Sequence, residues 1–207
     1  TSIWRSYPGR SYGAYATVTL GWESMVYLEL TGRNDWSGIL EHEKVTHFYP
    51  GASLSWLASE TFKENLPEWV TLLKMRGSYA VTGHGIGQPV NLDSYGISGN
   101  VWGSSAMGTI GGNLVDANIK PELSITKELG VDLGFFQNRI SANFTIYQKA
   151  HINQIQNLPV VASSGFGSML ANMGNVTSDG IEASLTVVPV RNRDWTWSVT
   201  GNAFFNK

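Results

Sequence analysis

The chain of 207 residues contains no cysteine, few charged residues and no long apolar run. The absence of cysteine excludes a disulfide framework and a thiolate metal site. No apolar run reaches the roughly 18 residues that a transmembrane helix needs, and residues 1–10 lack the apolar segment of a signal peptide. A net charge of −2 and a pI near 6.0 give no electrostatic reason to expect nucleic acid as a partner.

The chain does contain eight stretches in which apolar and polar residues alternate. Successive side chains of a β-strand point to opposite faces, so alternation predicts strands with one apolar face. The stretches are Tyr12–Trp22, Val26–Arg33, Gly51–Glu60, Val70–Val81, Leu123–Phe136, Arg139–Lys149, Val176–Val188 and Trp195–Asn206. Turn residues separate them, which predicts an all-β chain.

The gaps between these stretches are alternately short and long. In an up-and-down arrangement every second connection lies on the same side, so one side collects tight turns and the other collects large loops. Short periplasmic turns and long extracellular loops are typical of outer-membrane barrels. The order of the gaps therefore favours an antiparallel up-and-down transmembrane β-barrel.

Periodicity leaves the direction of the two faces open. A large membrane barrel turns its apolar face outward to lipid and its polar face toward the lumen. A soluble β-sandwich, for example a carbohydrate-binding module, turns its apolar face inward. On the barrel interpretation, Leu133 meets lipid and Asp132 meets the lumen.

Aromatic side chains gather at the strand ends that carry the short gaps. They are Trp22, Trp56, Trp69, Phe135, Trp195 and Trp197. Amphipathic rings collect at membrane interfaces, which favours a periplasmic girdle over the alternative of tryptophans that cap a soluble core. Lys127 departs from the pattern because it lies on the apolar face, where a charge near the midplane costs about 2–4 kcal/mol. Close to a long loop, it could reach the headgroup level.

The polar face and the loops favour an arc of a larger barrel. Eight strands can close a small barrel that side chains fill, but here the polar face carries charged residues such as Glu29, Lys74 and Glu182. The chain also begins almost directly in a strand and stops in another. We therefore expect about eight strands of a bigger barrel.

Four ordered motifs carry a family resemblance. They are YPGASLSWLASE (Tyr49–Glu60), LKMRGSYAVTG (Leu73–Gly83), IKPELSITKELGVDLGFFQNRISANFTIYQK (Ile119–Lys149) and NMGNVTSDGIEASL (Asn172–Leu185). In this order they resemble the barrel of the SusC/RagA-type TonB-dependent outer-membrane transporters of Bacteroidetes.

The resemblance implies a barrel of about 22 strands with a plugged lumen. It also implies a bacterial outer-membrane importer of oligosaccharides or peptides that works with TonB and a SusD-like lid lipoprotein. Residues 1–207 would then be part of the β-barrel domain, without the plug and N-terminal domains, and this polypeptide alone is not expected to transport.

Binding residues are expected in the long loops. Tyr95 and Trp102 lie in the loop Thr82–Lys120, and Phe166 lies in Ala150–Asn175. Exposed aromatic rings can stack on sugars, or they can simply pack the loop against its neighbours. These three residues are the predicted ligand-binding set.

Catalytic and metal motifs are weak. His42 and His47 flank Glu43 at a spacing that fits no zinc motif. The run Gly83–Gly87 lacks the Lys-Ser/Thr pair of a phosphate-binding loop. A small-barrel outer-membrane enzyme would need an acid–base or nucleophile cluster at its rim, and the sequence predicts none, nor a cofactor.

Overall fold

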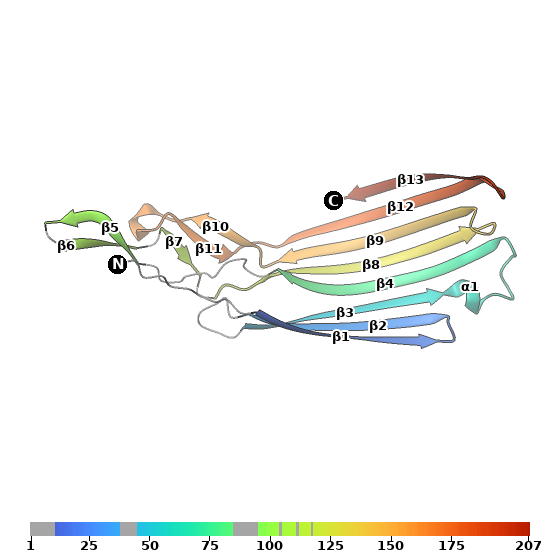
Figure 1. The fold of residues 1–207 in the computed structure, drawn as a ribbon, viewed down its shortest axis with the longest axis horizontal. Helices are drawn as coiled ribbons and strands as arrows, with labels where there is room; N and C mark the ends of the chain where they lie inside the picture. Colours follow the sequence, from blue (N-terminus) through green and yellow to red (C-terminus); the bar gives the residue numbers. More distant parts are fainter. Residues whose placement is uncertain (1–10, 38–44, 85–94, 104, 111, 117) are drawn as a thin grey trace.

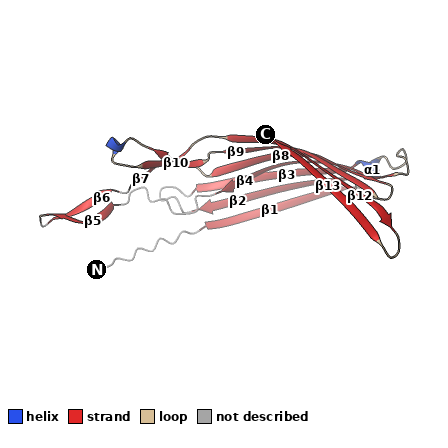
Figure 2. Ribbon diagram, turned by 90° about the horizontal axis from the view of Figure 1, so that it is seen from above, coloured by secondary structure: helices blue, strands red, loops and turns tan. Residues whose placement is uncertain are grey.

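Eight long strands of the computed structural model form one antiparallel sheet (Figure 1). The structure describes residues 11–37, 45–84, 95–103, 105–110, 112–116 and 118–207. In sheet order the strands are β1 (Ser11–Trp22), β2 (Val26–Ser37), β3 (Val45–Leu57), β4 (Val70–His84), β8 (Glu122–Phe135), β9 (Ile140–Ile152), β12 (Val176–Arg191) and β13 (Thr196–Asn206). All eight predicted stretches are confirmed as strands of one curved sheet, whose edges are β1 and β13 (Figure 2).

Tight turns join β1 to β2, β8 to β9, and β12 to β13 at one end of the sheet. The first turn uses left-handed backbone at Glu23 and Ser24 (φ 48° and 56°), and the second uses it at residues 136–138. In the third, the side-chain oxygen of Asn192 accepts a hydrogen bond from the backbone N–H of Trp195 (2.7 Å). These short reversals are the connections that the sequence assigns to the periplasmic side.

The connection between β3 and β4 differs from the prediction. The stretch expected to run over Gly51–Glu60 leaves the sheet at Leu57 and continues as α1 (Ala58–Thr61), a single helical turn. The backbone N–H of Phe62 donates to the carbonyl of Ala58 (3.0 Å). Local hydrogen bonds thus replace the strand ladder where the chain reverses toward β4.

The opposite end carries the long connections, which contain strands that the sequence did not predict. These are the hairpin β5 (Tyr95–Trp102) and β6 (Ser105–Ile110), and a sheet of β7 (Asn113–Val115), β10 (Ile155–Pro159) and β11 (Ser168–Asn172) with the 3-10 helix η1 (Ala162–Ser164). Both small sheets lie beyond the ends of the long strands rather than over a face of the large sheet (Figures 1 and 2).

Register places apolar side chains on one face across the whole sheet. One row of paired positions reads Leu20, Leu28, Leu54, Gly77, Leu129, Ile146, Ile181 and Phe205 from β1 to β13. Leu129 and Phe205 are 61% and 65% exposed, and no second sheet is stacked on this face in the described part of the chain. Since a sandwich buries its apolar face against another sheet, the structure contradicts the soluble sandwich alternative.

Two belts of aromatic side chains border the apolar face. The predicted girdle lies at the tight-turn end, where the rings of Trp69 and Phe135 have centroids 5.6 Å apart. An unpredicted second belt of Tyr12, Trp36 and Phe48 lies on the same face near the long connections. Tyr12 and Trp22 are separated by about 33 Å along β1. With a strand tilt of 35–45° this becomes about 25 Å along the membrane normal, the height of an apolar band.

Candidate functional site

The polar face of the sheet holds a hydrogen-bonded network at the middle of β4, β8 and β9. Arg76 Nη2 donates to Thr145 Oγ1 (2.7 Å), and Arg76 Nε lies 3.6 Å from Asp132 Oδ1. Asn143 Nδ2 donates a further hydrogen bond to the same carboxylate. Because each member has a partner, the network fixes the positions of polar groups along this stretch of the eight-stranded sheet, here called the wall.

A glycine between the partners makes the long contact from β4 to β9 possible. Gly130 on β8 is paired with Arg76 on one side and Thr145 on the other. A Cβ added to Gly130 would lie 2.7 Å from Arg76 Nε, which is too close for two non-bonded atoms. The bare backbone therefore lets the guanidinium cross a whole strand.

Nearer to β1, the polar face forms an open cavity of about 590 Å³. The polar side chains that line it are Tyr15, Thr17, Thr31, Arg33, Asp35, Tyr49 and Thr82. Arg33 Nε donates to both carboxylate oxygens of Asp35 (2.8 and 3.1 Å). Hydroxyls, a guanidinium and a carboxylate together offer donors and acceptors for a polar ligand.

The two long connections are tied to each other by the sheet of β7, β10 and β11, here called the loop sheet. β7 comes from the connection before β8 and pairs in parallel with β11, which comes from the connection after β9. Two backbone hydrogen bonds extend this pairing, from Asp116 N to Leu170 O (2.9 Å) and from Gly167 N to Gly112 O (2.8 Å). Segments far apart in the sequence thus form one surface above the wall.

Asn172 joins this surface to the rest of both connections. Its Nδ2 donates to the carbonyls of Lys120 and Asn153 (2.7 Å each), and its Oδ1 accepts from Lys120 N (2.6 Å). One side chain therefore uses both of its donors and its acceptor on backbone groups of both connections.

We expect Asn172→Ala to loosen the loop sheet without disturbing the wall. The change removes three hydrogen bonds, each contributing about 1 kcal/mol. Added protease should then cleave residues 153–175 several-fold faster on intact cells, while heat-modifiable gel mobility stays unchanged. The matched control is Asn157→Ala, an exposed amide of β10 without a side-chain hydrogen bond among the described residues. Equal cleavage of both variants would show that Asn172 does not hold the loops.

The predicted ligand residues lie in two separate regions, the β5–β6 hairpin and the segment that leads into β11. Tyr95 begins β5 and Trp102 ends it, and the side chains of both lie outside the part that the structure describes. Phe166 lies between η1 and β11, is partly exposed, and its backbone N–H donates to Ser164 Oγ (3.3 Å). The ligand role of these three aromatic residues stays a prediction.

The histidine motif is only partly visible. His42 and Glu43 lie outside the described residues, whereas His47 lies on β3 opposite Asp35 of β2. Within the described ranges, no group of three His, Asp or Glu side chains is placed to hold a metal ion. In the same part of the chain, no helix is both long and apolar enough to cross a membrane.

Comparison of the sequence with known proteins gives one family. The sequence model described as "TonB dependent receptor-like, beta-barrel" matches residues 2–205. TonB-dependent receptor P39 of Formosa agariphila is 27% identical over 195 residues, 93% of this chain and 18% of that protein. TonB-dependent receptor SusC of Bacteroides thetaiotaomicron is 24% identical over 183 residues, 83% of this chain and 18% of that protein. The chain thus spans about a fifth of the length of these relatives.

Solved structures show the same fold. The RagAB peptide importer in the 'closed-closed' state superposes with a TM-score of 0.83 at 20% identity, over 95% of this chain and 22% of that chain. The siderophore receptor PirA from Pseudomonas aeruginosa superposes with a TM-score of 0.58 at 17% identity, over 96% of this chain and 34% of that chain. At these identities the likeness shows the fold alone.

Proposed function

Because the chain belongs to the TonB-dependent receptor β-barrel family, we propose that its eight strands form part of the wall of a nutrient importer. The strands are an arc of an outer-membrane barrel, and the proposed cargo is an oligosaccharide or a peptide. The plug and the contact with TonB would come from other parts of the full-length receptor. Further barrel strands would pair with β1 and β13, since an open sheet edge in lipid leaves backbone groups without hydrogen bonds.

This proposal rests on one observation: one face of the eight-stranded sheet is apolar and the other is polar. The outward face is apolar across all eight strands, and the polar face presents hydroxyl, amide and paired charged groups to the lumen. Such groups can exchange hydrogen bonds with hydroxyls of a sugar or amides of a peptide as it passes. The relatives are receptors and transporters, which supports transport rather than catalysis as the role of this wall.

We further propose that the loop sheet meets the cargo and a SusD-like lid lipoprotein. The loop sheet and the β5–β6 hairpin lie beyond the loop-side ends of the long strands (Figure 1), so a lid that closes the barrel from outside would contact them. The hydrogen bonds of the loop sheet make it a firm surface rather than a set of separate loops. Tyr95, Trp102 and Phe166 are the proposed contact residues for the cargo.

Phe166→Ala is expected to weaken cargo binding several-fold in the full-length receptor. An aromatic ring that stacks on a sugar or packs on a peptide side chain loses that contact area when it is truncated. Val161→Ala is the matched control, because Val161 lies in the same connection and is 73% exposed. Binding would be measured by calorimetry with the cargo identified below. Equal affinities of the two variants would show that Phe166 only packs the loop.

The proposed function is tested by deleting the gene of the full-length receptor and measuring uptake. Cells with and without the gene would be given fluorescent oligosaccharides and fluorescent peptides as separate pools. We expect one pool to be taken up only by cells that carry both the gene and TonB. Uptake of both pools at equal rates in the two strains would contradict an import role.

A further inference from the structure

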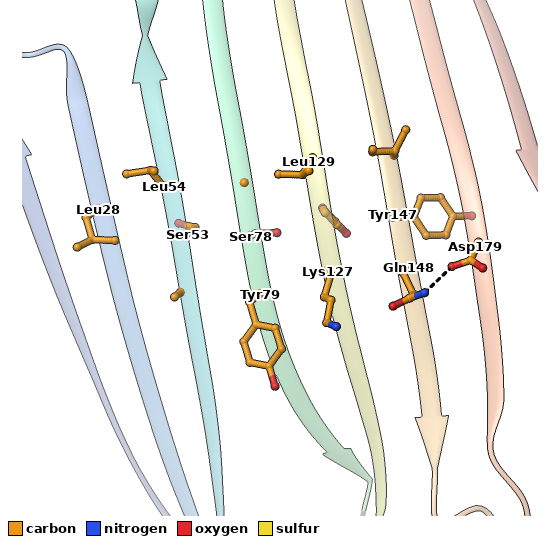
Figure 3. A pocket seen from close by; sticks show the side chains of 14 residues that line it. Leu28, Ser53, Leu54, Ser78, Tyr79, Lys127, Leu129, Tyr147, Gln148 and Asp179 are labelled. Atoms are coloured by element: carbon orange, nitrogen blue, oxygen red, sulfur yellow. Dashed lines mark hydrogen bonds between the residues drawn. The ribbon is translucent and has the colours of Figure 1, made fainter.

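The apolar outward face contains a shallow groove of about 670 Å³ over β2, β3, β4, β8, β9 and β12 (Figure 3). Its floor is open because Gly77 stands between Leu54 and Leu129 in the same row of paired positions. Leu28 and Ile146 extend the apolar surface to either side. Because Gly77 has no side chain, the row of branched side chains is interrupted there, and the surface is hollow at that point.

Polar side chains border this groove on the side of the long connections. They are Tyr79, Lys127, Gln148 and Asp179, which occupy one row on four adjacent strands. At a strand spacing of about 4.8 Å the row is about 14 Å wide. Figure 3 shows them on one side of Leu28, Leu54 and Leu129. The groove is therefore apolar at its floor and polar along one rim.

The depth of Lys127 places this rim in the outer leaflet. Lys127 precedes Phe135 of the tight-turn girdle by eight residues on β8, about 26 Å along the strand. With the usual strand tilt this is about 20 Å along the membrane normal, near the outer boundary of an apolar band about 25 Å tall. The long stem of Lys127 can carry its ammonium to the headgroups from there.

The charges on this face point to an anionic headgroup. On the outward face of the described residues, the charged side chains are Lys127, Asp179 and Lys207. Lys207 lies just past the end of β13, and its backbone exchanges two hydrogen bonds with that of Asp179 (3.0 and 2.9 Å). Asp179 Oδ1 accepts a hydrogen bond from Gln148 Nε2 (2.9 Å), whereas Lys127 forms no ion pair with any described residue. A cation at a lipid boundary is stabilised by a lipid phosphate, which also forms a charge-assisted hydrogen bond.

We propose that this groove binds lipid A, the phosphorylated and multiply acylated disaccharide of the outer leaflet. Lys127 binds the phosphate, and the Tyr79 hydroxyl and Gln148 amide face the sugar. The acyl chains lie on the floor left open by Gly77. A polar row about 14 Å wide suits an elongated disaccharide better than a single glycerophosphate group.

Native mass spectrometry of the full-length receptor tests the proposal. Delipidated receptor would be incubated at equal concentrations with lipid A, dephosphorylated lipid A or phosphatidylglycerol. We expect Lys127→Gln to retain lipid A about tenfold less than the unchanged receptor, the loss expected for one charged hydrogen bond. The matched control is Lys63→Gln, which removes an exposed lysine from the opposite, tight-turn end. It should retain lipid A fully.

A second variant tests the groove itself. Gly77→Leu fills the floor, and the tightest contact of its Cβ would be with the flexible end of Leu129, at 3.2 Å from Cδ2. We expect it to weaken retention of phosphorylated and dephosphorylated lipid A alike, whereas Lys127→Gln should weaken only the former. Heat-modifiable mobility checks that each variant is folded. Equal retention of lipid A by Lys127→Gln and the unchanged receptor overturns the proposal. Retention of phosphatidylglycerol as strong as that of lipid A also overturns it, because the groove would then be an ordinary phospholipid surface.

Discussion

Replacing Leu129 by arginine is expected to prevent most of the barrel from assembling. Leu129 lies on the outward face and precedes Phe135 by six residues, about 20 Å along the strand. Corrected for tilt, this is close to the bilayer midplane, where an arginine on the lipid face costs about 2–4 kcal/mol. The measurement is the fraction of full-length receptor in outer membranes that shows heat-modifiable mobility.

Two control substitutions distinguish the effect of the depth of the side chain in the bilayer from the effect of the face on which it lies. Leu133→Arg lies on the same face only two residues from Phe135, so its cost should fall to about 0–1 kcal/mol near the interface. Ser78→Arg places the same charge on the polar face, opposite Glu128, and should assemble normally. If Ser78→Arg impaired assembly as much as Leu129→Arg, the outward assignment of the apolar face would be wrong.

Single cysteines placed at the two ends of the strands should differ completely in labelling by an impermeant reagent on intact cells. The chain has no cysteine of its own, so the background from this segment is zero. A membrane-impermeant maleimide should label Ser164→Cys, in η1 among the long connections, on intact cells. It should label Lys63→Cys, in the connection between β3 and β4, only after the outer membrane is opened.

The opposite labelling result would contradict the predicted orientation of the strands. Both side chains lie on exposed connections at opposite ends of the strands, so poor reagent access does not explain a difference between them. Labelling of Lys63→Cys alone on intact cells would reverse the orientation of the barrel. It would also move the rim of the lipid groove to the periplasmic leaflet.

The long strands could be predicted because each keeps a period of two over at least eight residues. Their loop-side ends could not. The sequence interpretation ended the second stretch at Arg33 and began the third at Gly51, yet β2 and β3 stay paired to Ser37 and Val45. Gly32 and Pro50, which usually mark strand ends, are paired with each other inside the ladder. Trp36 and Phe48 of the loop-side aromatic belt lie on these extensions, so the belt was missed.

The contacts that form the candidate sites could not be predicted from the alternation of apolar and polar residues. The resemblance to known motifs identified the family, but the polar network depends on the bare backbone of Gly130 between Arg76 and Thr145. The loop sheet depends on β7 and β11, strands of three and five residues, which are too short for alternation to be recognised. In both cases the determining partner lies on another strand or another connection.

The parallel pairing of β7 with β11 has a consequence for the order of folding. Ser168 Oγ and Asn113 Oδ1 are 2.9 Å apart although their residues are 55 positions apart in the sequence. Closing so long a segment is entropically unfavourable until other contacts have shortened it. The β8–β9 hairpin does so, because it returns the chain to the same end of the sheet. The loop sheet should therefore form after the hairpin is in place, and an antibody specific for the folded loop sheet would recognise only receptors whose wall has already been assembled.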